Sequence, residues 1–336
     1  MIGRLPEGYT DRPACREDAE RAVELFNACA LRVVGEMPFD LEELLVEWNS
    51  PKFDLERDTR VVVSRTGKVV GYAEVWDATA PHVLPHIWGR VDPELVNCGI
   101  GSWLLAWEES RAAQALDKAP ADARVAIRTG AAEQDQASRD LFEANGYAAI
   151  RQFSRMIIEM DGAPERPTWP AGVSVRTFDR SQDLEPMVRA MQDAFADHWG
   201  HVDEPFEEEV QQWVHWIDND KEFDPALFFL AECDGEIAGA AFCTQKRPED
   251  PDLGWVYMLG VRRPWRRRGI ARSLLLHSFA TFYERGKTKA GLGVDAASLT
   301  GATRLYESAG MHCARRSFSY EKELRSGRDL STQSLA

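Results

Sequence analysis

Four landmarks occur twice along the chain, in the same order and at nearly the same spacing, and this repeat constrains the fold more than any other feature. The two copies of each landmark lie 164 to 170 residues apart in a chain of 336 residues. The pairs are Pro6–Thr10 with Pro170–Ser174, the hairpin at Gly71 with that at Gly239, Gly99-Ile100-Gly101 with Gly269-Ile270-Ala271, and Leu141–Gly146 with Leu305–Gly310. Chance can supply one such match but hardly four in register, so the sequence predicts two similar domains.

A seam between the two copies is visible as a change in composition. Two prolines and a glycine fall within residues 161–167, and such a stretch is poorly compatible with a helix or a central strand. The sequence therefore predicts an N-terminal domain over residues 1–160, a linker over 161–171, and a C-terminal domain over 172–324. The polar tail over 325–336 is expected to fray.

Apolar periodicity predicts the same order of strands and helices in both halves. In the C-terminal half we expect strands at 173–177, 227–232, 237–244, 255–261, 292–295 and 317–322, and helices at 183–196, 205–217, 269–284 and 300–306, the last capped by Thr300. In the N-terminal half we expect strands at 60–64, 69–75, 87–91, 125–128 and 156–160, and helices at 99–115 and 137–145. The predicted fold class is α+β (mixed α/β), with a twisted, mostly antiparallel mixed sheet flanked by helices in each domain.

Composition excludes several classes of function. The net charge of −15 disfavours a nucleic-acid-binding protein, which would normally be basic. The six cysteines form no C-x-x-C pair and have no zinc-type spacing with histidine, so we expect no metal and a reducing compartment. The sequence contains no run of about 18 apolar residues, so we expect no membrane span. The N-terminus lacks the apolar stretch of a signal peptide. We therefore expect a cytoplasmic protein, whose oligomeric state the sequence leaves open.

An arginine-rich segment, Arg266–Ala271, lies between a predicted strand and a predicted helix. The start of a helix presents unpaired N–H groups and the positive end of the helix dipole, and glycine allows close approach of a phosphate. With arginines adding charge-assisted contacts, the segment predicts a diphosphate site. A P-loop pattern is absent, and a dinucleotide fold would place its glycine loop after the first strand. A nucleic-acid patch is disfavoured by the net charge, and a merely solvated loop remains an alternative.

Together with the flanking segments Leu259–Val261 and Leu305–Met311, this loop makes the C-terminal half resemble the GNAT superfamily of acyl-CoA-dependent N-acyltransferases. In that family [RQ]-x-x-G-x-[GA] follows the fourth strand, and a late helix carries L-Y-x-x-x-G-[FM]. The repeat extends the resemblance over nearly the whole chain.

The resemblance implies a reaction and a set of site residues. Acetyl-CoA would be the co-substrate, and its thioester would lie between two splayed strands. A primary amine would attack directly in a ternary complex, and Tyr306 would protonate the departing thiolate. The implied cofactor-binding residues are Leu259, Gly260, Val261, Arg266, Arg267, Arg268, Gly269, Ile270, Ala271, Arg272 and Ser298, with Gly99, Ile100 and Gly101 in the N-terminal copy.

A narrower resemblance is to the tandem, two-domain members of the family found in actinobacteria, which include mycothiol synthase. Residues 293–302 resemble their V-D-x-x-N-x-T-G-A stretch, with Ser298 where asparagine is usual. Trp255 stands where mycothiol synthases carry the glutamate presumed to be the base, which argues against that activity. Asp252, Glu249, His198 and His201 remain candidates for the base. The loop that holds His198, Trp199 and His201 is expected to line the acceptor pocket.

The N-terminal copy lacks several side chains of this pattern. Val96 replaces the expected arginine or glutamine, Asn97-Cys98 replaces the basic pair, and Phe142 replaces the late tyrosine. We therefore predict that this half has lost catalysis. Its backbone N–H groups could still bind acetyl-CoA, or the half could act only as a scaffold. For the whole chain, a non-catalytic protein that binds or senses acyl-CoA remains the alternative to an N-acetyltransferase.

Overall fold

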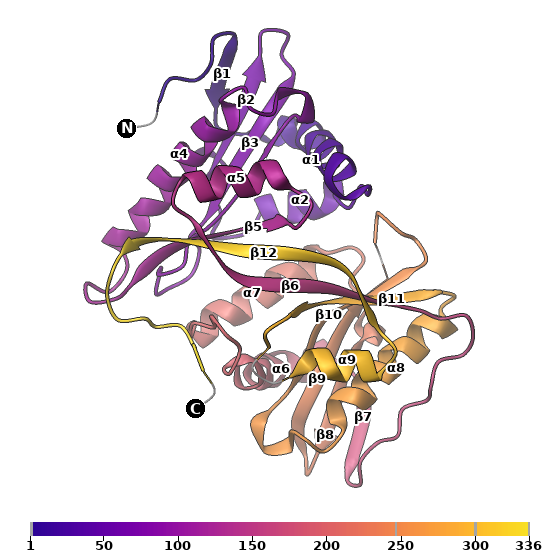
Figure 1. The fold of residues 1–336 in the computed structure, drawn as a ribbon. Helices are drawn as coiled ribbons and strands as arrows, with labels where there is room; N and C mark the ends of the chain where they lie inside the picture. The colour runs from indigo at the N-terminus through magenta and orange to yellow at the C-terminus, as the bar shows by residue number, and fades with distance from the viewer. Residues whose placement is uncertain (1–2, 246, 299–300, 335–336) are drawn as a thin grey trace. The chain divides into compact units, whose positions relative to one another are not determined.

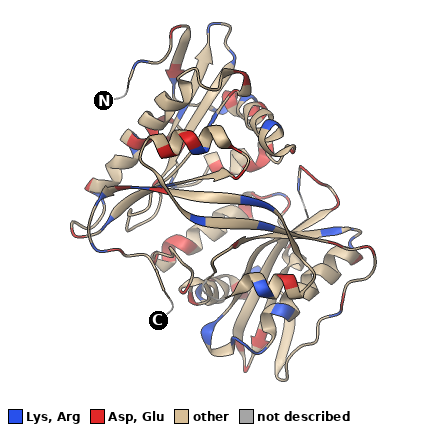
Figure 2. Cartoon of the chain, viewed as in Figure 1, with Lys and Arg blue, Asp and Glu red and all other residues tan. Residues whose placement is uncertain are grey.

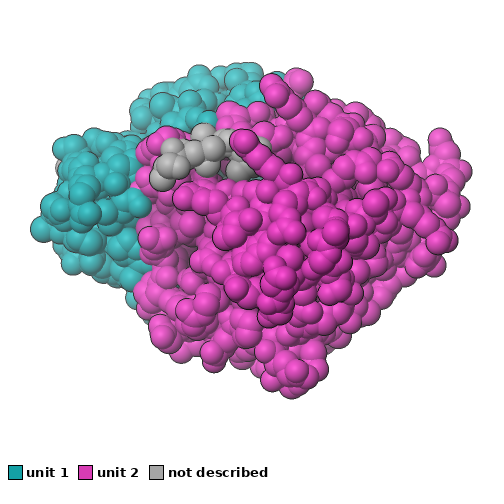
Figure 3. Space-filling view, turned by 90° about the horizontal axis from the view of Figure 1, so that it is seen from below, with its two compact units in different colours: residues 1–152, 317–330 teal, residues 153–316, 331–336 magenta. Residues whose placement is uncertain are grey.

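The computed structural model describes residues 3–245, 247–298 and 301–334 (Figure 1). The chain forms two compact units, which Figure 3 shows in separate colours. The N-terminal unit consists of residues 1–152 and 317–330, and the C-terminal unit of residues 153–316 and 331–336. Thr300, predicted as a helix cap, lies outside the described residues.

The N-terminal unit is a mixed sheet covered by helices. Its strands are hydrogen-bonded in the order β1-β2-β3-β4-β5-β12, and β4 and β5 are its parallel pair. The strands are β1 (Tyr9–Arg12), β2 (Thr59–Ser64), β3 (Val69–Trp76), β4 (His86–Val91), β5 (Val125–Ala132) and the second part of β12 (His312–Arg325). The helices are α1 (Ala19–Val34), α2 (Leu41–Trp48), α3 (Leu55–Asp58), α4 (Ile100–Ala112) and α5 (Gln136–Ala144).

The C-terminal unit repeats this architecture. Its strands are ordered β6-β11-β10-β9-β8-β7, and β10 and β11 are its parallel pair. The strands are the second part of β6 (Ala148–Glu159), β7 (Val173–Thr177), β8 (Phe228–Cys233), β9 (Glu236–Thr244), β10 (Leu253–Val261) and β11 (Lys289–Asp295). The helices are α6 (Arg180–Phe195), α7 (Phe206–Asn219), α8 (Ile270–Glu284) and α9 (Ala302–Ser308). The predicted fold class is confirmed for both units.

The final strand of each half belongs to the other unit. Residues 153–159 of β6 pair with β11, whereas residues 317–325 of β12 pair with β5. The sequence-based ranges had kept each final strand in its own half. The difference has a physical reason, because alternation of side chains identifies a strand but not its partner. Two homologous sheets present equivalent edges to two homologous strands.

Two layers of apolar side chains enclose each sheet. In the N-terminal unit, Phe26 and Trp48 of α1 and α2 pack against Tyr72 in one layer, and Leu104 of α4 lies in the other. In the C-terminal unit, a core that includes Met191 of α6 and Phe279 of α8 spans both faces of the sheet. Helices α1 and α2 were not predicted from the sequence, although Asp40 caps α2 by accepting hydrogen bonds from the backbone N–H groups of Glu42 and Glu43.

Charged side chains of both signs occur on each of the two units. Figure 2 shows acidic and basic residues interspersed over both units. Among the described residues, no helix has both the length and the apolar character needed to span a bilayer. The same residues contain no group of three histidine, cysteine or acidic side chains placed to hold a metal ion.

The close packing of α8 on the sheet predicts a large response to one added methyl group. A Cβ at Gly254 would lie 2.4 Å from ring atoms of Phe282, whereas a Cβ at Gly293 would meet no atom within 4 Å. Overpacking of a core typically costs about 1–3 kcal/mol. Gly254→Ala is therefore expected to lower the midpoint of thermal unfolding, and Gly293→Ala serves as the matched control. Equal midpoints for the two variants would contradict this packing.

Candidate active site

The parallel pair of the C-terminal unit separates part-way along its length. β10 pairs with β11 only from Leu253 to Val256, opposite Lys289 to Leu292. The register of β10 against β9 then shifts between Val256 and Met258, which leaves Tyr257 as a bulge with 52% of its surface exposed. The rest of β10 continues beside β9 alone, so a gap opens between β10 and β11.

Backbone donors face this gap. The N–H of Arg262 donates to the carbonyl oxygen of Ala238 at 2.9 Å, so it points toward β9. Because successive residues of a strand alternate in direction, the N–H groups of Val261 and Leu259 point away from β9. They face the side where the pairing with β11 has ended. The predicted Leu259–Val261 segment therefore presents hydrogen-bond donors along one wall of the gap.

The glycine loop lies at the start of α8, next to the end of β10. Gly269 is the residue before the helix and has φ of +90°. Because it has no side chain, it does not cap the N–H groups of the first turn. Arg267 also has a positive φ, of +59°. A Cβ at Gly269 would approach only Pro170, at 3.9 Å. The first turn of α8, with Ile270 and Ala271, thus offers open N–H groups in the geometry that binds phosphates elsewhere.

The arginines of this loop divide into two groups. Arg267 and Arg268 are exposed and make no ion pair within the part of the chain that the structure describes. Arg266 is held inward, since its Nε donates to the carbonyl oxygen of Val261 at 2.9 Å and a terminal nitrogen donates to that of Ala194 at 3.0 Å. These partners are distant in the sequence and could not be predicted from it. The sequence had instead predicted that Arg266 contacts the diphosphate of acetyl-CoA.

Two further arginines, Arg263 and the predicted cofactor contact Arg272, form ion pairs within the unit. Arg266 and Arg263 both donate to the carboxylate of Asp197, which is buried at the end of α6 and has a lowered pKa because of these two partners. Arg272 forms a bidentate pair with Glu165 of the linker, at 3.0 and 2.7 Å. Both members of this pair lie toward solvent, so it contributes little to stability. Arg266 therefore joins the loop to β10 and to the end of α6, whereas Arg267 and Arg268 are cations without an ion pair among the described residues.

Tyr306 lies on α9, which packs against β11, the other wall of the gap. Its side chain is 7% exposed, and burial raises the pKa of its hydroxyl to about 12. The hydroxyl therefore keeps its proton throughout the physiological range. Within the described residues it forms no hydrogen bond. Ser298 lies in the turn after β11, where its N–H donates to the carbonyl oxygen of Asp295 at 3.0 Å.

The loop after α6 holds the predicted acceptor-side residues. The ring of His198 packs edge-on against Phe195 at 4.3 Å between centroids. The pKa of His198 is lowered, chiefly by desolvation and then by the positive charge of Arg266, while Asp295 at the end of β11 raises it. A Cβ at Gly260 would lie 2.8 Å from the ring of Phe195, so Phe195 and the His198 ring packed on it lie beside the part of β10 that has left β11. His201 lies farther along the loop, 3.3 Å from Asp203.

The tail of the chain is attached to this loop, contrary to the expectation of fraying. The N–H of Gly200 donates to the carbonyl oxygen of Thr332 at 2.7 Å, and that of Thr332 donates to His201 at 2.8 Å. The indole N–H of Trp199 donates to Gln333 at 2.9 Å. No local sequence pattern predicts these bonds, because most of them use backbone groups.

The remaining candidates for a general base are poorly placed. Glu249 is buried, and one of its carboxylate oxygens accepts from Arg155 at 3.1 Å and from Arg247 at 2.6 Å. Asp252 precedes β10, at the end of the strand opposite the gap. The ring of Trp255 is flanked by the guanidinium groups of Arg155, at 5.1 Å, and Arg247, at 4.8 Å. Of the four candidates, only the two histidines lie in the loop on the acceptor side.

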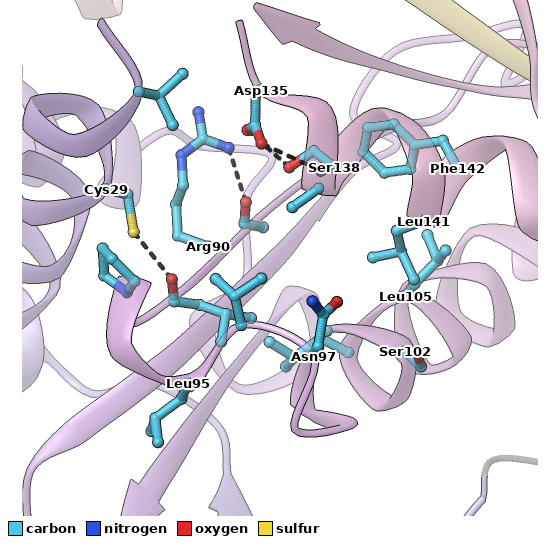
Figure 4. Close-up of a pocket in the computed structure, with 18 of the residues that line it drawn as sticks. Cys29, Arg90, Leu95, Asn97, Ser102, Leu105, Asp135, Ser138, Leu141 and Phe142 are labelled. Carbon is cyan, nitrogen blue, oxygen red and sulfur yellow. Dashed lines mark hydrogen bonds between the residues drawn. The ribbon is translucent and has the colours of Figure 1, made fainter. Parts of the chain in front are cut away.

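The N-terminal unit contains the corresponding gap. β4 and β5 pair only at His86 and Arg128, and a pocket of about 480 Å³ lies where these strands separate. Figure 4 shows residues of α4 and α5, including Leu105 and Phe142, on one side of this pocket. Asn97 and Gly99 have φ of +65° and +86°, as at Arg267 and Gly269. The copy has thus kept the backbone of the glycine loop, with Ile100 and Gly101 in the first turn of α4.

Comparison with known proteins agrees with this geometry. Residues 187–311 match the Acetyltransferase (GNAT) family. The mycothiol acetyltransferase of Thermobispora bispora is 37% identical over 169 residues, which are 49% of this chain and 55% of that protein. The chain thus spans about half the length of this relative. The mycothiol acetyltransferase of Streptomyces coelicolor is 32% identical over 254 residues, which are 73% of each chain.

Solved structures extend the likeness over both units. The GCN5-related N-acetyltransferase from Sphaerobacter thermophilus has a TM-score of 0.80 and 33% identity, over 98% of this chain and all of that chain. A tandem GNAT protein from the clavulanic acid biosynthesis pathway, at 16% identity, has a TM-score of 0.72 over 95% of this chain and all of that chain, and shows the same fold. The family match and these relatives agree with the duplicated gap, and the chain belongs to the GNAT family of acetyltransferases.

Proposed function

We propose that the C-terminal unit transfers an acetyl group from acetyl-CoA to a primary amine by direct attack in a ternary complex. The observation that carries this proposal is the separation of β10 from β11 beyond Val256, directly beside the open start of α8. One substrate can then place its diphosphate on the first turn of α8 and its thioester between the strands. The glycine at position 269 leaves room for that diphosphate.

The proposed reaction assigns a group of this unit to each chemical step. The amine nitrogen attacks the thioester carbon, and the negative charge that develops on the carbonyl oxygen is stabilised by N–H groups of Leu259 and Val261. The carbon–sulfur bond then breaks, and the Tyr306 hydroxyl gives its proton to the thiolate. The proton lost by the amine passes to His198, directly or through water, and solvent restores the proton of Tyr306.

A neutral His198 is required for this last step, which predicts a pH dependence. Because the pKa of His198 is lowered from the ordinary value of about 6.5, the imidazole is mostly neutral at neutral pH. Protonation should therefore reduce kcat/KM only as the pH falls below about 6.5. His198→Gln should remove this acidic limb, and His312→Gln, in exposed β12, is the control. An unchanged limb in His198→Gln would exclude the histidine as the base.

The acceptor is proposed only as a primary amine. The relatives in Thermobispora bispora and Streptomyces coelicolor are named mycothiol acetyltransferases. In this chain, the arginine-flanked ring of Trp255 stands on β10 where a glutamate base was expected. This difference favours an acceptor other than theirs, or a base on another element such as His198.

The experiment that tests the proposal follows release of free CoA thiol from acetyl-CoA in the presence of a panel of primary amines. Amine-dependent release supports transfer. Tight binding of acetyl-CoA without release for any amine would favour the alternative, a protein that binds or senses acyl-CoA. The lack of a carboxylate base on β10 is the observation that keeps this alternative in view.

A further inference from the structure

The pocket of the N-terminal unit contains an arginine that makes no ion pair with any residue that the structure describes. Arg90 extends from β4 between α1 and the start of α5 (Figure 4), and its guanidinium lies 4.0 Å from the ring of Trp88. One nitrogen donates to the carbonyl oxygen of Gly89 at 2.7 Å. Within the described residues it makes no ion pair, although burial lowers its pKa. Since an arginine remains charged in proteins, most of its donors are left for a ligand.

The nearby carboxylates are committed to other partners. Asp135 accepts from both the N–H and the hydroxyl of Ser138, at 3.1 and 2.7 Å, and so caps α5. Glu74 accepts from the hydroxyl of Tyr72 at 2.6 Å and from the indole N–H of Trp76 at 3.0 Å. Both contribute negative potential at Arg90 without a direct contact. As far as the described residues go, the guanidinium of Arg90 therefore keeps unused donors inside the pocket.

A second polar side chain in the same pocket has an oxygen that no described residue contacts by a hydrogen bond. Glu108 of α4 is only 4% exposed, and its Oε1 accepts no hydrogen bond from any described residue. That oxygen lies 3.1 Å from where a Cβ of Gly89 would stand, so the glycine makes room for the carboxyl group. Burial raises the pKa of Glu108 well above its usual range, which favours the protonated form that can donate a hydrogen bond. A buried group of this kind is expensive to leave unpaired.

The fold itself does not require this pair. At the equivalent positions of the C-terminal unit stand Gly260 and Ser278, as counted from the repeat offset of the glycine loops. A Cβ at Gly260 would lie 2.8 Å from Phe195, and the hydroxyl of Ser278 already donates to the carbonyl oxygen of Leu274 at 2.9 Å. One copy thus carries a cation and an acid where the other copy carries two small, uncharged residues. This difference points to different ligands in the two gaps.

The pocket also reaches the start of α4, a helix of 13 residues. Asn97, Gly99 and Gly101 line it at this end, and Arg90 and Glu108 line it at the other. A ligand that fills it can therefore be anionic at both ends. We propose that the N-terminal unit binds an acyl-CoA whose acyl chain ends in a carboxylate, with the diphosphate at the start of α4 and the carboxylate on Arg90 and Glu108. This site is independent of acetyl transfer in the C-terminal unit.

The test uses the full chain carrying Gly269→Glu, which closes the C-terminal loop, and calorimetric titration with succinyl-CoA, acetyl-CoA and free succinate. We expect succinyl-CoA to bind one per chain and at least about 10-fold more tightly than acetyl-CoA, as one charge-assisted hydrogen bond implies. Equal affinities for the two thioesters would overturn the proposal. Succinate binding as tightly as succinyl-CoA would also overturn it, because the pocket would then serve a free carboxylate.

Arg90→Met in the same background removes the charge while keeping an unbranched side chain. It should weaken succinyl-CoA binding by about 10- to 100-fold and change the affinity for acetyl-CoA by no more than about 3-fold. Arg90→Lys should retain part of the preference, which separates charge from packing. With Gly269 intact, Arg90→Met should leave acetyl transfer unchanged, which shows that the variant is folded. Unaltered succinyl-CoA affinity in folded Arg90→Met would refute the assignment, whatever the outcome of the transfer assay.

Discussion

Tyr306→Phe is expected to lower kcat for acetyl transfer by about 10²- to 10⁴-fold, the usual contribution of a positioned general acid. The variant keeps the aromatic ring in the core and removes only the hydroxyl, so the KM for acetyl-CoA should change little. Because the pKa of Tyr306 is raised to about 12 by burial, the wild-type hydroxyl is fully protonated in the assay. Initial rates of CoA thiol release, measured at saturating amine, give the comparison.

The matched control is Tyr283→Phe, which removes a hydroxyl from an exposed tyrosine of α8 in the same unit. It should leave kcat unchanged. If Tyr306→Phe retains the wild-type kcat, the acid must be another group or water. If KM and kcat change together and the unfolding midpoint falls, the tyrosine has a packing role instead.

Gly269→Glu is expected to weaken acetyl-CoA binding at the C-terminal unit by about 100-fold or more. Two effects act together. The φ of +90° strains any side chain, and the new carboxylate would stand at the helix start that is to receive a diphosphate. Calorimetric titration of acetyl-CoA gives both the affinity and the number of sites per chain.

Gly269→Ala separates these two effects, because it introduces the same backbone strain without the charge. We expect it to weaken binding by less than about 10-fold, in line with a strain of about 1–2 kcal/mol. The equivalent change in the other copy, Gly99→Glu, reports on the N-terminal unit. Equal affinities for wild type and Gly269→Glu would mean that acetyl-CoA does not use this loop.

The glycine loops and the helix that carries Tyr306 could be located from the sequence. Backbone geometry around Gly269 depends on local residue choice, and the repeat shows where the second loop must lie. Local sequence patterns do not show which distant group will form a hydrogen bond with a given side chain. Arg266 therefore looked like a phosphate ligand, although its donors meet Val261, Ala194 and Asp197.

Arg90 and Glu108 are a second case in which the sequence alone did not identify candidate site residues. Arg90 and Glu108 lie 18 residues apart on a strand and a helix, and neither belongs to a recognisable motif. Their significance comes from a shared pocket. Among the described residues, Arg90 makes no ion pair and the Oε1 of Glu108 accepts no hydrogen bond. The absence of a partner is a property of the folded chain, so only the structure could single them out.

The sequence by itself determined that the chain is a duplicated mixed α/β protein with two glycine loops and one late tyrosine, because repeats, caps and alternation are local in origin. The tertiary structure decided which sheet receives each final strand, which arginines remain free, and where the tail is attached. These depend on contacts between residues far apart in the chain, whose free energies are set by packing and burial rather than by neighbouring residues.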